Sequence, residues 1–339
     1  MSASPIGIRS ALAGILAAAA MLAGCEAPPP ESGQIGFRGV SMMTLDNPDA
    51  LAETQAVSVA PPPSIPLIPA TGGPKARDVF RNVQVLGDLE IGQFNRLMVS
   101  ITEWVAPEQG CAYCHGGTDM SLDDHYAKVV SRRMLEMTRH INRNWTVHVG
   151  NTGVTCFTCH RGRPVPPRLW FEERGLPQAG GYAASRQDQN LAMSEVAFTS
   201  LPYDPLSRFL LTDEEVSVQA ARALPRGDAI GTKRAEHTYA LMMHLSESLG
   251  VNCTYCHNSR AFGQWPQSPP ARATAWRGIR MVRDLNREYL VPLGPQYPPE
   301  RLGPHGDPPK ASCATCHGGQ PLPLNGARML DDFPSLAAR

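Results

Sequence analysis

The chain has 339 residues, enough for one large or two small domains. Its 31 basic and 31 acidic residues give no net charge, which argues against nucleic acid as a partner because phosphate binding requires a basic surplus. Only 18% of the residues are charged, and 32 prolines and 30 glycines favour a fold rich in irregular loops.

The segment 1–24 is typical of a bacterial export signal. Arg9 is the only charged residue before a run of small and apolar residues at 11–24. That run is too short to cross a bilayer, but it has the length of the apolar core of a signal peptide. We therefore expect the segment 1–24 to direct the chain to the periplasm.

Cys25 follows the apolar run directly. The sequence Leu-Ala-Gly-Cys at 22–25 resembles the lipobox of bacterial lipoproteins. This resemblance implies that Cys25 is lipidated and anchors the chain to the inner membrane. The alternative is an ordinary signal peptide followed by a chance cysteine. Residues 25–75 contain two triple-proline runs and little periodicity, which predicts an extended tether behind the anchor.

The eight remaining cysteines all fall in Cys-x-x-Cys-His motifs. The four motifs are Cys111/Cys114/His115, Cys156/Cys159/His160, Cys253/Cys256/His257 and Cys313/Cys316/His317. This pattern is typical of c-type haem attachment, in which the two thiols bond to the haem and the histidine binds its iron. Thioredoxin-like pairs or zinc sites would not require histidine at this position every time. The sequence therefore predicts four covalently bound c-type haems.

Helical segments before the first two motifs recur, at a constant offset, before the last two. The residues 137–143, MTRHINR, correspond to the residues 281–287, MVRDLNR. Apolar residues at 97, 98, 101 and 105 recur at 241, 242, 245 and 249, with the spacing of an amphipathic helix. We expect a mainly α fold with extensive irregular loops, a multihaem cytochrome built from two pseudo-symmetric haem-pair repeats.

The repeat also divides the chain into segments. We assign haems 1 and 2 to residues 76–165 and haems 3 and 4 to residues 225–320. Residues 166–224 connect the two repeats, and residues 321–339 form a C-terminal tail; neither segment carries a motif that we can assign.

Methionines of these helices are candidates for the second axial ligand of each iron. Met98 precedes His115 on a predicted helix that leads into a turn, and Met242, its repeat equivalent, precedes His257 in the same way. Met134 is the candidate for the haem of His160, although Met137 competes with it. Methionine on an apolar helix face can also be simple core filler.

The fourth haem requires a different ligand because the repeat equivalent of Met134 is Gly278. Met281 remains one candidate. Histidine is the other, and His148 continues the apolar face formed by Ile141 and Trp145. The histidines outside the motifs are His125, His140, His148, His237, His244 and His305.

Several strings in combination resemble the tetrahaem cytochrome subunit of the photosynthetic reaction centres of purple bacteria. The strings are RMLEMT at 133–138, NW at 144–145 followed by His148, GVTC at 153–156, YALMM at 239–243 and GVNCTYCHN at 250–258. The resemblance implies His/Met ligation by Met98, Met134 and Met242 for the first three haems. It implies that His148 and His317 both bind the fourth.

The resemblance also implies a function. In that family the haems form a chain at the periplasmic face of the photosynthetic membrane and re-reduce the photo-oxidised bacteriochlorophyll pair. The third-motif haem lies nearest the pigment and the first-motif haem lies outermost. The implied partners are the reaction-centre L, M and H subunits and a soluble cytochrome c or high-potential iron-sulfur protein as donor. Residues 97–127 contain five acidic residues and no Lys or Arg, which predicts docking of a basic donor beside the first motif.

Two other functions compete with this interpretation. A low-potential periplasmic multihaem carrier that feeds a reductase would bind each iron through two histidines, and the repeated methionines would then be unexplained. A multihaem enzyme would need an iron with an open position, whereas each iron here has a candidate sixth ligand. We therefore expect an electron-transfer protein and not an enzyme.

Overall fold

The computed structural model describes residues 31–34, 43–46, 49, 61–172, 193–218 and 232–337, and the chain forms two compact units, 1–53 and 54–339. In the first unit, β1 (Glu31–Gln34) pairs with β2 (Met43–Asp46) in antiparallel register. The predicted export signal and Cys25 lie outside the described residues. None of the described helices is both long and apolar enough to cross a membrane.

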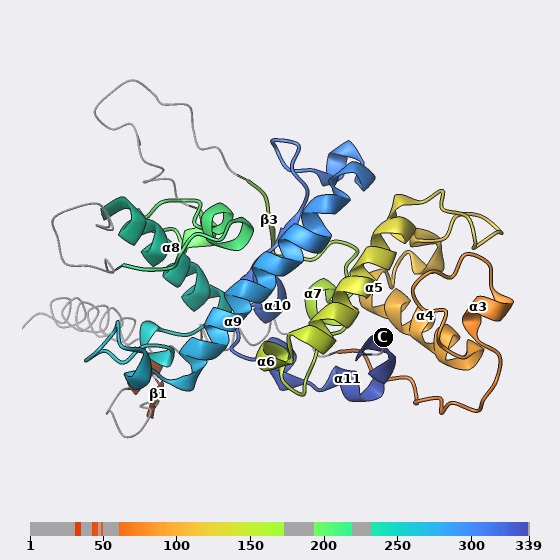
Figure 1. Cartoon of the computed structure of the whole chain (residues 1–339), viewed down its shortest axis with the longest axis horizontal. Helices are drawn as coiled ribbons and strands as arrows, with labels where there is room; N and C mark the ends of the chain where they lie inside the picture. Colours follow the sequence, from red (N-terminus) through yellow and green to blue (C-terminus); the bar gives the residue numbers. More distant parts are fainter. Residues whose placement is uncertain are drawn as a thin grey trace, which may run out of the picture. The chain divides into compact units, whose positions relative to one another are not determined.

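Four long helices dominate the second unit (Figure 1). They are α4 (Ile91–Val105), α5 (Tyr126–Asn144), α8 (Thr232–Leu249) and α9 (Pro270–Leu285). Short helices and loops form most of the remainder, and β3 (Leu169–Trp170) pairs with β4 (Lys310–Ala311). The expectation of a mainly α fold with extensive loops is therefore confirmed.

Each long helix leads to one Cys-x-x-Cys-His motif. The helix α4 begins with a capping box, in which Glu90 and Gln93 bind each other's backbone N–H groups. Pro270 starts α9, where a missing N–H group costs nothing. The first and third motifs begin in the short helices η2 (Gly110–Tyr113) and η5 (Cys253–Tyr255), whereas the second and fourth form α7 (Cys156–His160) and α10 (Cys313–His317).

Two apolar clusters hold these helices in place. One packs Leu97, Trp104, Leu135 and Phe157 against residues close to the C-terminus, which are Leu324, Met329, Phe333 and Leu336. The other packs Leu241, Ile279 and Leu285 against Leu206, Phe209 and Leu210. The segments 321–339 and 166–224, in which no sequence motif could be assigned, thus each supply part of a core.

Two short helices in these segments make corresponding contacts. Asn142 on α5 donates to the carbonyl of Leu336 in η11 (Pro334–Ala337) at 3.0 Å. Asn286, which follows α9, donates to the carbonyl of Leu210 in η4 (Ser207–Leu211) at 3.2 Å. Arg139 and Arg283 likewise donate to the carbonyls of residues 335 and 209, each at 3.1 Å.

The same two asparagines also bind the backbone just before a Cys-x-x-Cys-His motif. Asn142 exchanges two hydrogen bonds with the backbone of Val154, at 2.9 and 2.8 Å. Asn286 exchanges two with the backbone of Ala311, both at 2.9 Å. Both asparagines are buried, so these bonds satisfy backbone groups that water cannot reach. Val154 and Ala311 each lie two residues before the first cysteine of a motif.

Candidate haem sites

A cavity of about 1000 Å³ runs between the helices of the second unit. It is lined by the cysteines and histidines of the first, second and fourth motifs, and by Met98, Met134 and His148. Leu, Ile, Val and Met side chains form much of its wall, as an apolar macrocycle requires. Met242 and His257 do not line it, although Tyr255 of the third motif and Leu245 of α8 do.

The four motif histidines are oriented in the same way. Each has Nδ1 within 3.0 Å of a backbone carbonyl oxygen, and the pairs are His115 with Met120 (3.0 Å), His160 with Arg163 (2.9 Å), His257 with Phe262 (3.0 Å) and His317 with Gln320 (2.9 Å). Because a carbonyl only accepts, Nδ1 carries the proton in each ring. The other nitrogen, Nε2, then has its lone pair available to bind iron.

Burial keeps several of these rings neutral. It lowers the pKa of His160 and His257, and it lowers the pKa of His317 to about 4. A neutral imidazole is the form that binds a metal. The donor set therefore fits haem iron.

The motifs have two local geometries. The second and fourth form short α-helices with capping boxes, built by Thr155 with Thr158 and by Ser312 with Thr315. In the first and third, the cysteines lie on a tighter 3₁₀ turn. The histidine bonds a carbonyl three residues later in the α type and five residues later in the 3₁₀ type.

His148 and His317, the two histidines predicted to bind the fourth haem, lie close together, with their ring planes inclined at 66°. Their ring centroids lie 6.0 Å apart, which leaves room for one metal bonded to both rings at about 2 Å. Nδ1 of His148 donates to the carbonyl of Thr274 at 3.0 Å, so this ring too keeps Nε2 available. Gly278 packs against it: a Cβ at residue 278 would lie 2.6 Å from His148 Cε1.

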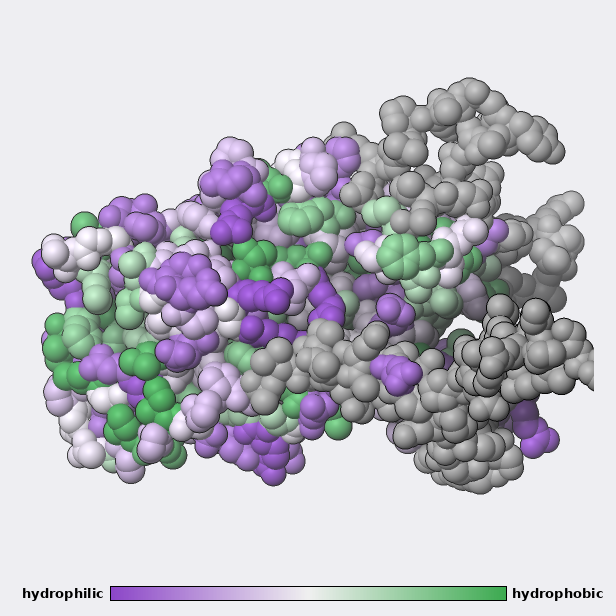
Figure 2. Space-filling model, turned by 180° about the vertical axis from the view of Figure 1, so that it is seen from behind, coloured by the Kyte–Doolittle hydropathy of each residue, from purple (hydrophilic) through white to green (hydrophobic). Residues whose placement is uncertain are grey.

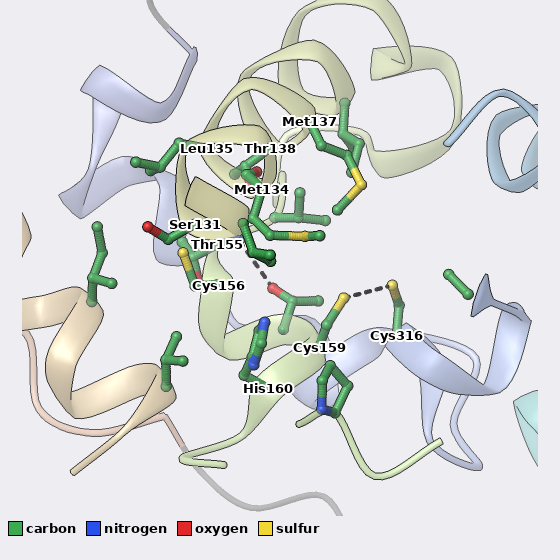
Figure 3. Close-up of a pocket in the computed structure, with 18 of the residues that line it drawn as sticks. Ser131, Met134, Leu135, Met137, Thr138, Thr155, Cys156, Cys159, His160 and Cys316 are labelled. Carbon is green, nitrogen blue, oxygen red and sulfur yellow. Dashed lines mark hydrogen bonds between the residues drawn. The ribbon is translucent and has the colours of Figure 1, made fainter. Parts of the chain in front are cut away.

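Two methionines of α5 project toward the second motif. Figure 3 shows Met134 and Met137 directed into the pocket that His160, Cys156 and Cys159 line. The structure thus brings the preferred ligand Met134 and its competitor to the same place. Met98 lines the cavity with His115. Met242 is half-buried and packs against the cluster that contains Leu241.

The second and fourth motifs are direct neighbours. The sulfur atoms of Cys159 and Cys316 lie 3.1 Å apart (Figure 3). Arg161, which follows the second motif, donates to the carbonyl of Cys316 at 3.0 Å. The described cysteines form no disulfide, and burial raises the pKa of Cys156 and Cys313 to about 12. Because the eight motif cysteines form no disulfide, all eight thiols remain available for bonds to haem.

Two of the five acidic residues in the segment 97–127, beside the first motif, form ion pairs. Asp119 forms an ion pair with Arg81 at 3.5 Å, and Asp123 forms one with Arg132 at 2.7 Å. These basic partners lie outside 97–127 and were missed in the sequence. The other acidic residues of the segment, which are exposed and have no ion pair among the described residues, are Glu103, Glu108 and Asp124.

Apolar side chains are exposed in the same region. Met120 and Leu122 follow the first motif and are both more than half exposed. Figure 2 shows hydrophobic and hydrophilic residues interspersed over the end of the second unit that contains α4 and the short helix α3 (Ala76–Val79).

Most of the chain is similar to a known family of proteins. The sequence profile of the photosynthetic reaction centre cytochrome c subunit matches residues 26–337. The photosynthetic reaction center cytochrome c subunit of Rubrivivax gelatinosus is 50% identical, with 96% of this chain and 89% of the relative covered. The subunit of the same name from Thermochromatium tepidum is 47% identical, with 95% and 79% covered.

A third relative, the Roseobacter denitrificans subunit, is 42% identical, with 90% of this chain and 85% of the relative covered. These matches do not favour a low-potential carrier that feeds a reductase. Covalent c-type haem and association with a membrane complex follow from membership of this family. The protein belongs to the photosynthetic reaction centre cytochrome c subunits, and it is an electron carrier of the reaction centre, not an enzyme.

Proposed function

We propose that this chain holds four haems, one at each Cys-x-x-Cys-His motif, and uses them to re-reduce the bacteriochlorophyll pair. The observation that carries the proposal is the shared orientation of the four motif histidines, each with Nδ1 on a carbonyl and Nε2 available. Bound haem would supply a one-electron Fe(II)/Fe(III) couple at each site. The chain would bind the haems, orient their axial ligands and exclude water from the cavity.

The proposed axial partners are the candidates that the sequence offered. Met98, Met134 and Met242 complete the sites of His115, His160 and His257, and His148 completes the site of His317. The rings of His148 and His317, whose centroids lie 6.0 Å apart, support the last pair. A methionine ligand raises the potential relative to a second histidine, so the fourth site is expected to have a lower potential than its neighbours.

The two haem pairs, within 76–165 and 225–320, are proposed to be related by a pseudo-twofold axis. His140 and Asp284 occupy equivalent repeat positions and contact each other directly, with Nε2 and Oδ2 2.7 Å apart. Equivalent residues meet in this way at a twofold axis. The parallel bonds of Asn142 and Asn286 support the same relation.

The proposed order of the sites along the protein is first, second, fourth, third. The neighbouring sulfur atoms of Cys159 and Cys316 support adjacency of the second and fourth sites. The first and third sites would then lie at opposite ends, one for the soluble donor and one for the pigment pair. Lipidation of Cys25, a tether over residues 25–75 and contact with the L, M and H subunits complete the proposed assembly at the periplasmic face of the membrane.

Flash absorption spectroscopy on membranes that contain this protein tests the proposal. We expect haem oxidation in step with re-reduction of the pigment pair. Replacing Met242 with histidine should lower the potential of the third site, so the electron hole left by donation to the pigment pair should stay on that site for longer. Replacing Met243 with leucine is the matched control on the same helix. Haem bands that do not respond to the flash would refute the reaction-centre function.

The proposed donor is a soluble periplasmic protein, either a cytochrome c or a high-potential iron-sulfur protein, that docks beside the first motif. The double variant Glu108→Gln and Asp124→Asn should slow haem re-reduction by a basic cytochrome c severalfold at low salt and flatten its salt dependence. Asp213→Asn, an exposed carboxylate elsewhere, is the control. An unchanged salt dependence would exclude electrostatic docking at these residues.

A further inference from the structure

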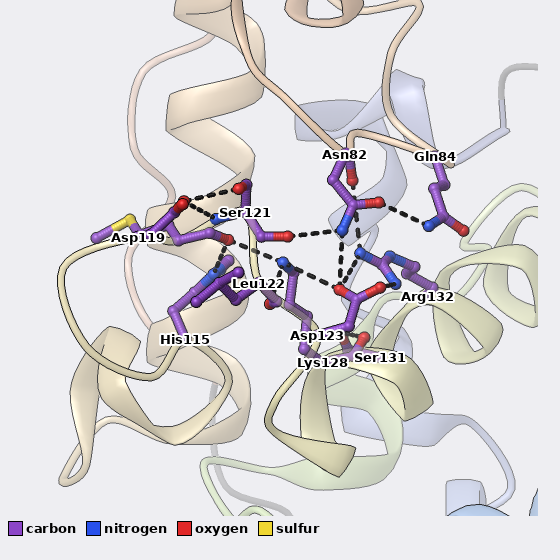
Figure 4. A network of polar contacts seen from close by, with 11 residues as sticks. Asn82, Gln84, His115, Asp119, Ser121, Leu122, Asp123, Lys128, Ser131 and Arg132 are labelled. Atoms are coloured by element: carbon purple, nitrogen blue, oxygen red, sulfur yellow. Dashed lines mark hydrogen bonds and ion pairs between the residues drawn. The ribbon is translucent and has the colours of Figure 1, made fainter.

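A buried lysine shares the backbone carbonyl that orients the first motif histidine. Lys128, which is 7% exposed, donates to the carbonyl of Met120 at 2.8 Å and to that of Leu122 at 2.7 Å. The Met120 carbonyl also accepts the hydrogen bond from His115 Nδ1 at 3.0 Å. Figure 4 shows this network, in which one carbonyl oxygen lies between an ammonium group and an imidazole ring.

Among the described residues, the carboxylate that forms an ion pair with this ammonium group is Asp123. Asp123 Oδ1 lies 3.2 Å from Lys128 Nζ. The carboxylate also accepts from Arg132 at 2.7 and 2.8 Å and from Asn82 at 3.0 Å. Hydrogen bonds from Arg132 are the largest cause of a pKa well below the ordinary value for aspartate. Asp123 is therefore ionised at neutral pH and held in place against Lys128.

The third motif has a cation in the place that Lys128 occupies at the first motif, but no carboxylate among the described residues forms an ion pair with it. Arg272, the repeat equivalent of Lys128, donates to the carbonyl of Phe262 at 3.2 Å, and this carbonyl accepts from His257 Nδ1 at 3.0 Å. Its other described partners are the Ser268 hydroxyl at 2.7 Å and the Trp265 ring at 4.1 Å. At the second and fourth motifs, no Lys or Arg side chain among the described residues is seen to donate a hydrogen bond to the carbonyl that accepts from the motif histidine.

We infer that Lys128 is a positioning residue that raises the reduction potential at the first motif, and that Asp123 reduces its effect. This inference rests on the proposed binding of haem by His115. The ammonium group withdraws electron density from the Met120 carbonyl, which weakens its hydrogen bond with Nδ1–H and makes the imidazole a poorer electron donor. The cation also disfavours the additional positive charge of the ferric state. Both effects favour the reduced state, and the negative charge of Asp123 opposes both.

Equilibrium redox titration of the purified full-length cytochrome tests this inference. Lys128→Gln retains an N–H donor for Met120 but loses the charge, and it should shift one of the four potentials downward. We expect roughly a tenfold change in the ferric/ferrous equilibrium, which is about 59 mV for one electron. Asp123→Asn should shift the same potential upward, and the other three potentials serve as internal references.

The opposite signs of the two expected potential shifts distinguish an effect of charge from a purely structural effect on the loop. If Lys128 and Asp123 only hold the loop over residues 119–123, either variant would loosen His115, and both would shift the potential in the same direction and alter the electron paramagnetic resonance spectrum of that iron. Lys128→Arg should restore the potential, and Lys75→Gln, a partly exposed lysine outside the network, should leave it unchanged. Unshifted potentials in a fully loaded protein would overturn only the inference about Lys128. A mass that shows no haem on Cys111 and Cys114 would overturn the proposed first site as well.

Discussion

Replacing Gly278 with alanine is expected to detach His148 from the fourth haem iron. The new Cβ would lie 2.6 Å from Cε1 and 3.1 Å from both nitrogens of the His148 ring, so the ring must move away from its position opposite His317. One of the four irons should change from low spin to high spin in the electron paramagnetic resonance spectrum of the oxidised protein. The ligand should be lost even though the substitution favours the helix itself, because Gly→Ala in a helix interior ordinarily stabilises the helix by about 0.5–1 kcal/mol.

Gly294→Ala is the matched control for this change. The nearest atoms to a Cβ at residue 294 would be those of Pro308, at an ordinary 3.6 Å, so the spectrum should remain that of the unaltered protein. The result also decides between the two ligands left open by the sequence. If Met281 bound the fourth iron, all four irons of the Gly278→Ala variant would stay low spin, and the assignment of His148 would fail.

Removing residues 321–339 is expected to destroy the first haem pair. The deletion takes Leu324, Met329, Phe333 and Leu336 out of the cluster that surrounds α4 and α5. Burial of each such side chain contributes about 1.5–3 kcal/mol, so the loss would approach the whole stability of a domain, about 5–15 kcal/mol. The truncated chain should retain fewer than four haems and be cleaved by proteases within 76–165.

Deletion of residues 338 and 339 alone is the control for the truncation, because it spares all four of these side chains. The single substitution Phe333→Ala should give an intermediate result, with a loss of about 3–5 kcal/mol for removal of a buried aromatic ring. Recovery of the truncated protein with four haems and unchanged thermal unfolding would show that the C-terminal segment is dispensable.

Much of the proposed haem chemistry could be predicted from the sequence because it depends on residue identity. Cys-x-x-Cys-His positions two thiols and an imidazole by local geometry alone. Likewise, the absence of a side chain at Gly278 indicated that the fourth haem needs a different ligand, with His148 as one of two candidates, before the contact of Gly278 with His148 was known. The contact gives a further reason for glycine: residue 278 lies against the histidine ring and has no space for a Cβ.

Other features depend on backbone groups and long-range contacts, which leave no signal in one sequence. The residues 207–211, SRFLL, and the residues 334–337, PSLA, share no pattern, but they occupy corresponding places because their carbonyls accept from Asn286 and Asn142. Any residue type supplies such a carbonyl. For the same reason, the bonds from His115 and Lys128 to the Met120 carbonyl could not be predicted. Met137 competed with Met134 in the sequence because the two residues lie one helical turn apart, and both enter the same pocket.

The packing of the C-terminal segment against α4 and α5 has a consequence for biosynthesis. Leu336 lies far downstream of Phe157 in sequence, beyond the third and fourth motifs, yet both belong to the same core. The scaffold of the proposed first haem pair can therefore reach its final packing only after the last residues have been synthesised and have closed a very long loop, a slow step in folding. Until then, Cys111 and Cys156 remain on an unfinished scaffold. This delay would keep their thiols accessible to the machinery that attaches haem, and would make premature termination near the C-terminus damage the earliest-made sites first.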